Sequence, residues 1–282
     1  MVVEVVKKSG LREPFNPDKV KRAVMRSGAS EETAQKVVDR VDAKIYDGIN
    51  THDIYDIAFR ILDRERHSLA SVYDLKRAIM RLGPAGYSFE TYMGEILGGQ
   101  GLSTRLRQIL RGGCGVHEID VVWEEQKGSY TLVECKYHNM EGICTGLKAA
   151  LYTYARFLDL REGWEVGRKG YCFTSVMLAT NTKFSSASLE YSLCRGVRLL
   201  GWQYPKGEGI NTLIDRKKLY PLTILRKVDP VSKGKFSDAG IMMVKDLLSN
   251  TPEQLAVKTN IPARKIRDFR NEARGLLSLQ LD

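Results

Sequence analysis

Two apolar segments in the middle of the chain alternate with the period of a β-strand. In residues 115–122, Asp120 interrupts a hydrophobic run, and in residues 130–138, Glu134 and Lys136 do so two positions apart. Because successive side chains of a strand point to opposite faces, Glu134 and Lys136 share one face. The polar stretch between the segments contains a glycine, as a hairpin connection requires. The sequence therefore predicts a β-hairpin that brings an aspartate, a glutamate and a lysine together.

This set of side chains is typical of metal-assisted cleavage of a phosphodiester. Two carboxylates hold a hard divalent cation, and a neighbouring ammonium group stabilises an attacking water or the charge that develops at phosphorus. The tripeptide Asp/Glu-x-Lys recurs along the chain, but only Glu134-Cys135-Lys136 lies inside an apolar strand that follows another acid-bearing strand. The remaining triplets fit solvated faces. Asp120, Glu134 and Lys136 are therefore the candidate catalytic residues.

The arrangement resembles the PD-(D/E)xK nuclease superfamily, and most closely its Mrr-like restriction endonucleases and related resolvases. Such enzymes usually add a glutamate on the helix before the hairpin, and residues 86–97 supply Glu90 next to an apolar stripe at helical spacing. Glu90 fits equally well as a first-turn residue that the helix dipole favours. The sequence departs from the family pattern at Ile119, where a proline would precede the aspartate.

The resemblance implies a role for each member of the set. Asp120 and Glu134, with the main-chain carbonyl of Cys135, would bind Mg²⁺ or Mn²⁺. Lys136 would position or activate the attacking water, and Glu90 would complete the catalytic set. The expected reaction is the hydrolysis of phosphodiester bonds in double-stranded DNA.

The residues after the hairpin continue this resemblance. We expect a helix over 142–160, a buried strand over 170–179, a polar turn over 180–185, a helix over 184–195 and a strand over 197–202. Strands and helices that alternate after a hairpin predict a mixed sheet with helices on its faces. Mrr-like relatives also carry a Thr-Asn-x-x-Phe segment at this turn, where Lys183 fits either a contact to a DNA phosphate or a solvated loop lysine.

Two histidines near the hairpin have open roles. By alternation His138 lies on the same face as Glu134 and Lys136. There it fits a proton shuttle, a phosphate ligand or a hydrogen-bonding residue at the strand end. His117 faces a similar choice. The spacing Cys135-x-x-His138 lacks the second ligand pair that a zinc site needs.

Residues 1–85 open with a hairpin that turns at Ser9-Gly10, followed by a helix that Asn16 caps, with Pro17 in its first turn. Thr51 is expected as the N-cap of a later helix. The expected helices that follow the first one span residues 31–46, 51–66 and 68–82.

This order of elements resembles an ATP-cone domain, a small regulatory module that binds nucleotides. The resemblance implies that the phosphates of ATP or dATP contact basic side chains and one helix N-terminus. The implied binding residues are Lys7, Lys8, Lys19, Arg22 and Thr51. The alternative is a helical cap whose lysines are solvated and whose Thr51 only caps a helix.

The C-terminal part becomes helical again after a polar linker over residues 226–235. Tight turns near 239–241 and 259–262 resemble those of helix-hairpin-helix motifs, which present backbone N–H groups to DNA phosphates without reading sequence. Arg264, Lys265 and Arg267 would add to that contact. The alternative is a helical bundle that docks another protein.

Composition sets further bounds. With 282 residues and 43% hydrophobic content, the chain can bury the cores of two or three domains. The net charge of +10 is spread along the chain and favours a polyanionic partner. No segment reads as a membrane span or a signal peptide. Five cysteines without paired spacings are expected to be reduced and mostly in apolar surroundings, which favours a cytoplasmic location.

These observations predict an α/β, multi-domain chain with a mixed-sheet, restriction-endonuclease-like core. The expected domains are an ATP-cone-like domain over 1–85, a nuclease domain over 86–225, a linker over 226–235 and a helix-hairpin-helix-like domain over 236–282. The expected activity is that of a Mg²⁺-dependent endodeoxyribonuclease, tuned by ATP or dATP, in restriction or repair. Because a duplex has two strands, a homodimer is the simplest assembly that cuts both.

Two alternatives stay open. The first is a nucleotide-sensing DNA-binding regulator whose nuclease fold is inactive. The second is an enzyme that acts on RNA or on branched repair intermediates, because such enzymes share the same catalytic residues.

Overall fold

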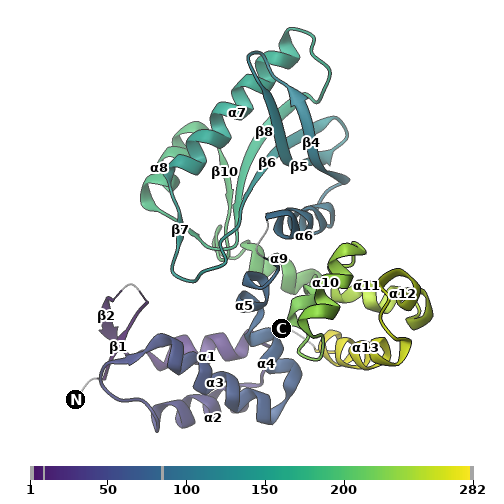
Figure 1. Cartoon of the computed structure of the whole chain (residues 1–282). Helices are drawn as coiled ribbons and strands as arrows, with labels where there is room; N and C mark the ends of the chain where they lie inside the picture. Colours follow the sequence, from purple (N-terminus) through teal and green to yellow (C-terminus); the bar gives the residue numbers. More distant parts are fainter. Residues whose placement is uncertain (1–2, 9, 84–85, 280–282) are drawn as a thin grey trace. The chain divides into compact units, whose positions relative to one another are not determined.

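The computed structural model describes residues 3–8, 10–83 and 86–279. The chain divides into two compact units, of which unit 1 comprises residues 1–78 with 222–282 and unit 2 comprises residues 79–221. The predicted N-terminal and C-terminal modules thus belong to one unit, and the hairpin lies in the other (Figure 1).

Unit 2 is built on a mixed sheet, as predicted, and this sheet has five strands. The strand order is β10-β8-β6-β5-β4. Strands β4, β5 and β6 are antiparallel neighbours, whereas β6, β8 and β10 run parallel. The strands are β4 (Ser103–Arg111), β5 (Val116–Gln126), β6 (Ser129–Lys136), β8 (Phe173–Thr180) and β10 (Arg198–Leu200). The sequence interpretation missed β4, and the predicted hairpin is β5–β6, which turns at Gly128 with a φ of 77°.

Helices cover this sheet. Figure 1 shows α7 (Leu147–Glu165) and α8 (Ser186–Arg195) along one face, and α6 (Gly86–Gly98) packs against β4, β5 and β6. Burial of the apolar side chains of α7 against the sheet supplies the hydrophobic stabilisation of the unit. The buried cluster that α7 forms with the sheet includes Ala150, Phe157 and Leu160 of the helix and Ile119, Leu132, Leu178 and Leu199 of the strands. Helix α9 (Ile210–Lys217) follows the last strand.

The predicted polar turn after β8 begins with three buried residues. Thr180, Asn181 and Thr182 are each at most 3% exposed, and the segment continues into a two-stranded sheet of β7 (Cys144–Thr145) and β9 (Lys183–Phe184). Asn181 accepts a hydrogen bond from the backbone N–H of His138 at 2.9 Å and donates one to its carbonyl at 2.7 Å. Buried polar groups require such partners. The turn is therefore an internal clamp on the end of β6.

The N-terminal part of unit 1 combines a small sheet with helices. The strands β1 (Glu4–Val6), β2 (Arg12–Pro14) and β3 (Ile49–Asn50) have the order β2-β1-β3. The helices are α1 (Pro17–Met25), α2 (Glu31–Asp42), α3 (Thr51–Glu65), α4 (His67–Tyr73) and α5 (Leu75–Met80). The predicted hairpin and the Asn16 cap of α1 are present, although Ser9 lies outside the described residues.

Two details of this part differ from the sequence expectation. Asn50 is the N-cap of α3, so Thr51 is its first helical residue. The single helix expected over 68–82 is two helices, because Asp74 leaves helical geometry between them.

The C-terminal part of unit 1 is helical. It contains a 3₁₀ turn (Leu222–Ile224), α10 (Pro230–Asp238), α11 (Val244–Ser249), α12 (Pro252–Thr259) and α13 (Ala263–Leu277). The predicted linker over 226–235 is therefore helical from Pro230, because the Asp229 side chain accepts the Ser232 N–H at 3.0 Å and caps α10. The turns have left-handed residues at Gly240 and Asn260. Helix α13 packs against α4.

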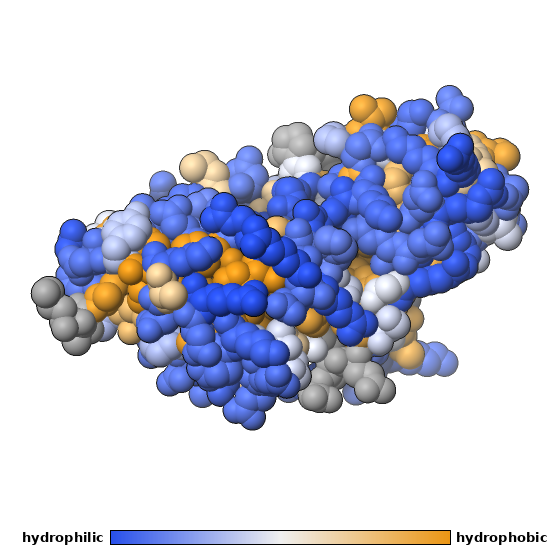
Figure 2. Space-filling view, turned by 90° about the horizontal axis from the view of Figure 1, so that it is seen from below, coloured by the Kyte–Doolittle hydropathy of each residue, from blue (hydrophilic) through white to orange (hydrophobic). Residues whose placement is uncertain are grey.

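The surface and the cysteines complete the description. The face drawn in Figure 2 is largely hydrophilic, and hydrophobic side chains show there as a strip between hydrophilic ones. Among the described helices, none combines the length and the apolar character that a membrane span needs. All five cysteines are free, as expected, but only Cys135 is buried, so the expectation of mostly apolar surroundings was wrong.

Candidate active site

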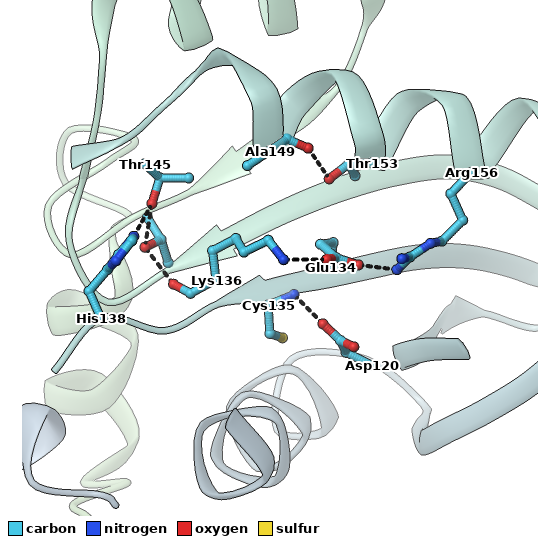
Figure 3. Close-up of polar contacts among 10 residues, drawn as sticks. Asp120, Glu134, Cys135, Lys136, His138, Thr145, Ala149, Thr153 and Arg156 are labelled. Carbon is cyan, nitrogen blue, oxygen red and sulfur yellow. Dashed lines mark hydrogen bonds and ion pairs between the residues drawn. The ribbon is translucent and has the colours of Figure 1, made fainter. Parts of the chain in front are cut away.

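The β5–β6 register brings the predicted acids together. Val121 pairs with Val133 and Val122 with Leu132, so Asp120 directly precedes one residue of the end pair and Glu134 directly follows the other. The Asp120 carboxylate also reaches across to the second strand, where its Oδ2 accepts the backbone N–H of Cys135 at 2.7 Å (Figure 3). The pairing that the sequence predicted is thus present, and it holds Asp120 beside the Glu134-Cys135-Lys136 segment.

Glu134 lies between two cations. Its side chain is only 6% exposed, Lys136 Nζ lies 2.9 Å from Oε1, and Arg156 pairs with Oε2 (Figure 3). A buried carboxylate needs such partners to offset its loss of hydration. Arg156 comes from the middle of α7, 22 residues along the chain, and the sequence interpretation did not identify it. No specific signal in the sequence marked it, because α7 carries other charged residues as well, among them Lys148 and Arg161.

Asp120 has an unusual ionisation equilibrium. Burial raises the pKa of its carboxyl to about 7, and repulsion from the charges of Glu134 and Glu90 adds to this effect. The hydrogen bond from Cys135 and the charge of Arg156 act in the opposite direction. Perturbed carboxyl groups of this kind concentrate at functional sites, because a bound cation or a proton relieves the repulsion. Asp120 is therefore poised to take up either one.

Glu90 faces the same site rather than serving at a helix terminus. Helix α6 begins at Gly86, so Glu90 lies beyond its first turn. Burial raises the pKa of Glu90, and its Oε2 lies 3.6 Å from Arg107 Nη1. Arg107 has a φ of 49°, a rare conformation for a residue other than glycine. It lies where the β4–β5 pairing passes from Leu106 to Gln108, opposite Asp120.

These carboxylates are neighbours but do not form one coordination shell in this conformation. Within the described part of the chain, the ligand atoms of Glu90, Asp120 and Glu134 do not all lie within 4.8 Å of one another. Glu134 is instead paired with the cations of Lys136 and Arg156. A divalent cation shared by these acids would have to replace at least one of those ion pairs.

The histidines and Lys183 have simpler surroundings. His138 Nε2 lies 3.0 Å from Thr145 Oγ1, and burial lowers the pKa of its imidazole. Of its alternative roles, the geometry favours the hydrogen-bonding residue at the strand end. His117 Nε2 lies 2.6 Å from Asp159 Oδ2. Lys183 is an exposed residue of β9.

The structure brings two of the predicted nucleotide-binding lysines to one carboxylate. Lys7 Nζ and Lys19 Nζ lie 2.5 and 3.0 Å from the two oxygens of Glu13, and these ion pairs lower its pKa. Lys8 is exposed. Arg22 donates to the main-chain carbonyl of Asp18 at 3.2 Å, and Thr51 lies at the N-terminus of α3.

The predicted DNA-binding residues of α13 are partly engaged within the chain. Lys265 Nζ lies 2.6 Å from Asp229, and Arg267 Nη1 lies 2.9 Å from Glu253. Arg264 is exposed at the start of the same helix. Exposed ion pairs such as these contribute little stability. A phosphate could therefore replace the carboxylate partner of either side chain with little loss of free energy.

Comparison with known proteins gives two matches to family models and a close relative. Residues 3–79 match the ATP cone domain, and residues 220–277 match the model described as AF1548-like, C-terminal. An uncharacterized protein of Archaeoglobus fulgidus (strain ATCC 49558) is 39% identical over 185 residues, which cover 66% of this chain and 99% of that protein.

A solved structure shares much of the fold. It is the crystal structure of a protein of unknown function, AF1548, which is 38% identical, with a TM-score of 0.59. The similarity covers 68% of this chain and 98% of that one.

Proposed function

Because the chain belongs to the AF1548-like family and carries an ATP-cone domain over residues 3–79, we propose that it is a metal-dependent DNA endonuclease regulated by a nucleotide. ATP-cone domains bind nucleotide effectors such as ATP and dATP, and the match accounts for the predicted N-terminal module. The nuclease activity is our inference from the β5–β6 site.

One observation carries the proposal, namely the carboxylate pair of the half-buried Asp120 and the buried Glu134 next to a lysine. Asp120 and Glu134 flank the Val121–Val133 pair that ends the strand register, and Lys136 Nζ lies 2.9 Å from Glu134. Burial raises the pKa of Asp120, and repulsion from the negative charge of Glu134 raises it further. Carboxylate pairs that repel one another in this way are favourable ligands for a cation, which removes the repulsion.

The donors fit Mg²⁺ or Mn²⁺, because Asp120, Glu134 and the Cys135 carbonyl offer only oxygen atoms. A bound ion of this class supplies charge neutralisation at the scissile phosphate and lowers the pKa of a coordinated water. Lys136 is then free of Glu134 and holds the attacking water through its ammonium group. Arg156, released in the same way, contacts a non-bridging phosphate oxygen.

The arrangement of unit 1 supports nucleotide control. The ATP cone and the C-terminal helices share this unit, where α13 packs against α4 and Arg226 forms an ion pair with Asp63 of α3. In our proposal, nucleotide phosphates displace Glu13 from Lys7 and Lys19, and the helices of the cone transmit this change to the C-terminal helices. Arg264 at the start of α13 is the proposed contact to the DNA backbone. A homodimer would cut both strands.

Cleavage of a supercoiled plasmid tests the proposal. With Mg²⁺ and ATP or dATP, the wild type should convert supercoiled DNA to nicked and linear forms, and Lys136→Ala should lower the rate at least a hundredfold while retaining duplex binding. The matched control is Lys127→Ala, which removes the exposed lysine of the neighbouring Glu125-Gln126-Lys127 triplet. Equal rates for the two variants would refute the catalytic role of Lys136.

The regulator with an inactive fold is the second candidate. The paired cations on Glu134 favour it, because they neutralise this carboxylate without any metal. The same assay separates the two, since a regulator binds duplex DNA in a nucleotide-dependent way and cleaves no substrate under any metal condition. Comparison of linear, branched and RNA substrates then assigns the substrate class.

A further inference from the structure

A second group of metal-binding side chains lies at the β4–β5 turn. Cys114 belongs to this turn and His117 to the start of β5, whereas Asp159 and Glu162 lie three residues apart on one face of α7. One donor atom from each of Cys114, Asp159 and Glu162 lies within 4.8 Å of the other two. The His117 Nε2 atom lies 2.6 Å from Asp159 Oδ2.

The turn is fixed against α7 by its backbone. Asp159 accepts the N–H groups of Gly113, Cys114 and Gly115, at 2.8, 2.7 and 3.1 Å, through its carbonyl and its two carboxylate oxygens. A Cβ atom on Gly163 of α7 would lie 2.7 Å from a backbone carbon of the turn. Because the two backbones touch, the position of the Cys114 side chain beside α7 is set before any ligand binds.

The Cys114 thiol and the Glu162 carboxylate take no part in anchoring the turn. In the described part of the chain, neither the Cys114 thiol nor the Glu162 carboxylate has a hydrogen-bond or ion-pair partner. The contacts of Asp159 are made by backbone N–H groups and His117. The exposed Cys114 thiol and the exposed Glu162 carboxylate thus lie next to an aspartate–histidine pair, with three donor atoms gathered within 4.8 Å of one another and open to an ion from solvent. This convergence is the observation that points to a ligand.

The donor set selects the class of ion. A thiolate and an imidazole are ligands of Zn²⁺ and related transition metals, whereas Mg²⁺ and Ca²⁺ take oxygen ligands. Bond lengths of about 2.0–2.3 Å around a tetrahedral ion place neighbouring ligand atoms roughly 3.5 Å apart. The donor atoms of Cys114, Asp159 and Glu162, which lie within 4.8 Å of one another, therefore need side-chain movements of only about 1 Å to reach that geometry. His117 would join as the fourth ligand by exchanging its contact with Asp159 for the ion.

We propose that Cys114, His117, Asp159 and Glu162 bind a divalent transition metal of the Zn²⁺ class, which ties the β4–β5 turn to α7. This site shares no ligand with the proposed Mg²⁺ site and does not depend on nuclease activity. Binding releases the Cys114 proton to solvent, because the thiolate is the ligand.

Titration with Co²⁺ tests this site without any activity assay. Protein stripped of metal by a chelator should bind one Co²⁺ with a thiolate-to-cobalt charge-transfer band, which Zn²⁺ then abolishes by displacement. Cys114→Ser should remove the band, and Glu162→Gln should weaken binding at least tenfold. The control is Cys194→Ser, which changes an exposed cysteine of α8 and should leave the titration unchanged.

Three results would overturn the proposal. They are absence of the band in the wild type, persistence of the band in Cys114→Ser, and its loss in Cys194→Ser. Circular dichroism of each variant without metal confirms that the fold is retained. Because neither variant removes a hydrogen bond of the turn, a loss of binding in a folded variant reports on ligation.

Discussion

Replacing Asp120 by asparagine tests the electrostatics of the candidate active site, and the structure gives the expected magnitude. The pKa of Asp120 is about 7 in the folded protein and near 3.8 in an unfolded chain. A group whose pKa is raised by folding favours the folded state while it is protonated. Its ionisation therefore destabilises the fold progressively as the pH rises from about 4 to about 7.

The size of this destabilisation follows from the difference between the two pKa values of Asp120. Each pH unit corresponds to about 1.4 kcal/mol, so roughly three units correspond to about 4 kcal/mol. Asparagine carries no charge, and its side-chain oxygen can still accept the Cys135 N–H. At pH 8 we expect Asp120→Asn to raise the free energy of unfolding by about 2–4 kcal/mol, and at pH 4.5 by only about 1 kcal/mol.

Urea denaturation in the presence of EDTA measures this difference. The tryptophans Trp123, Trp164 and Trp202 all lie within residues 79–221, so their fluorescence reports on unit 2 alone. Addition of Mg²⁺ at pH 8 should stabilise the wild type and have little effect on the variant. A control, Glu190→Gln on the exposed face of α8, should change stability by less than about 0.5 kcal/mol.

One outcome would refute this reasoning. If Asp120→Asn were no more stable than the wild type at pH 8, or gained the same stability at both pH values, the carboxyl group would not be under electrostatic strain. A cation would then have no electrostatic reason to bind at this position.

Three further predictions address other parts of the chain. Arg156→Ala should lower the free energy of unfolding by about 1–3 kcal/mol in urea denaturation, because it leaves a buried carboxylate with fewer partners. Gly163→Ala should lower it by about 1–3 kcal/mol in the same assay, because the new methyl group overlaps the backbone of the β4–β5 turn. Lys19→Ala should weaken ATP binding about tenfold in isothermal titration calorimetry, a loss of about 1.4 kcal/mol.

Each of these has a matched control. Arg161→Ala removes an exposed arginine of the same helix, Gly275→Ala adds a methyl group with open space around it, and Lys36→Ala removes a lysine paired with Glu32 on α2. The controls should be close to neutral, with Gly275→Ala neutral or stabilising. If a control changed stability or ATP affinity as much as the variant it is paired with, the explanation given for that variant would be wrong.

The sequence predicted the parts of the fold that follow a simple period. The β5–β6 hairpin was predicted because apolar and polar residues alternate on either side of a glycine turn, and α7 because its apolar residues recur at helical spacing. Strand β4 was missed because Arg105, Arg107 and Arg111 break its hydrophobic pattern. At Arg107 the backbone also leaves strand geometry, so alternation cannot continue through that residue.

Arg156 and Asn181 were not identified from the sequence for a different reason. Arg156 reaches Glu134 only because α7 lies across the sheet at one particular rotation, which no local pattern specifies. Asn181 was assigned to a polar loop because its composition is polar, although its amide is used to close the end of β6. Composition indicates that a segment is polar, whereas only the tertiary fold decides whether its partners are water or protein.

Anomalous diffraction from crystals grown with Mn²⁺ and a DNA duplex tests the central claim most directly. We expect a peak within coordination distance of carboxylate oxygens from both Asp120 and Glu134, with Lys136 turned away from Glu134 toward the scissile phosphate. A structure in which Mn²⁺ occupies other positions while Glu134 keeps its ion pairs with Lys136 and Arg156 would contradict it.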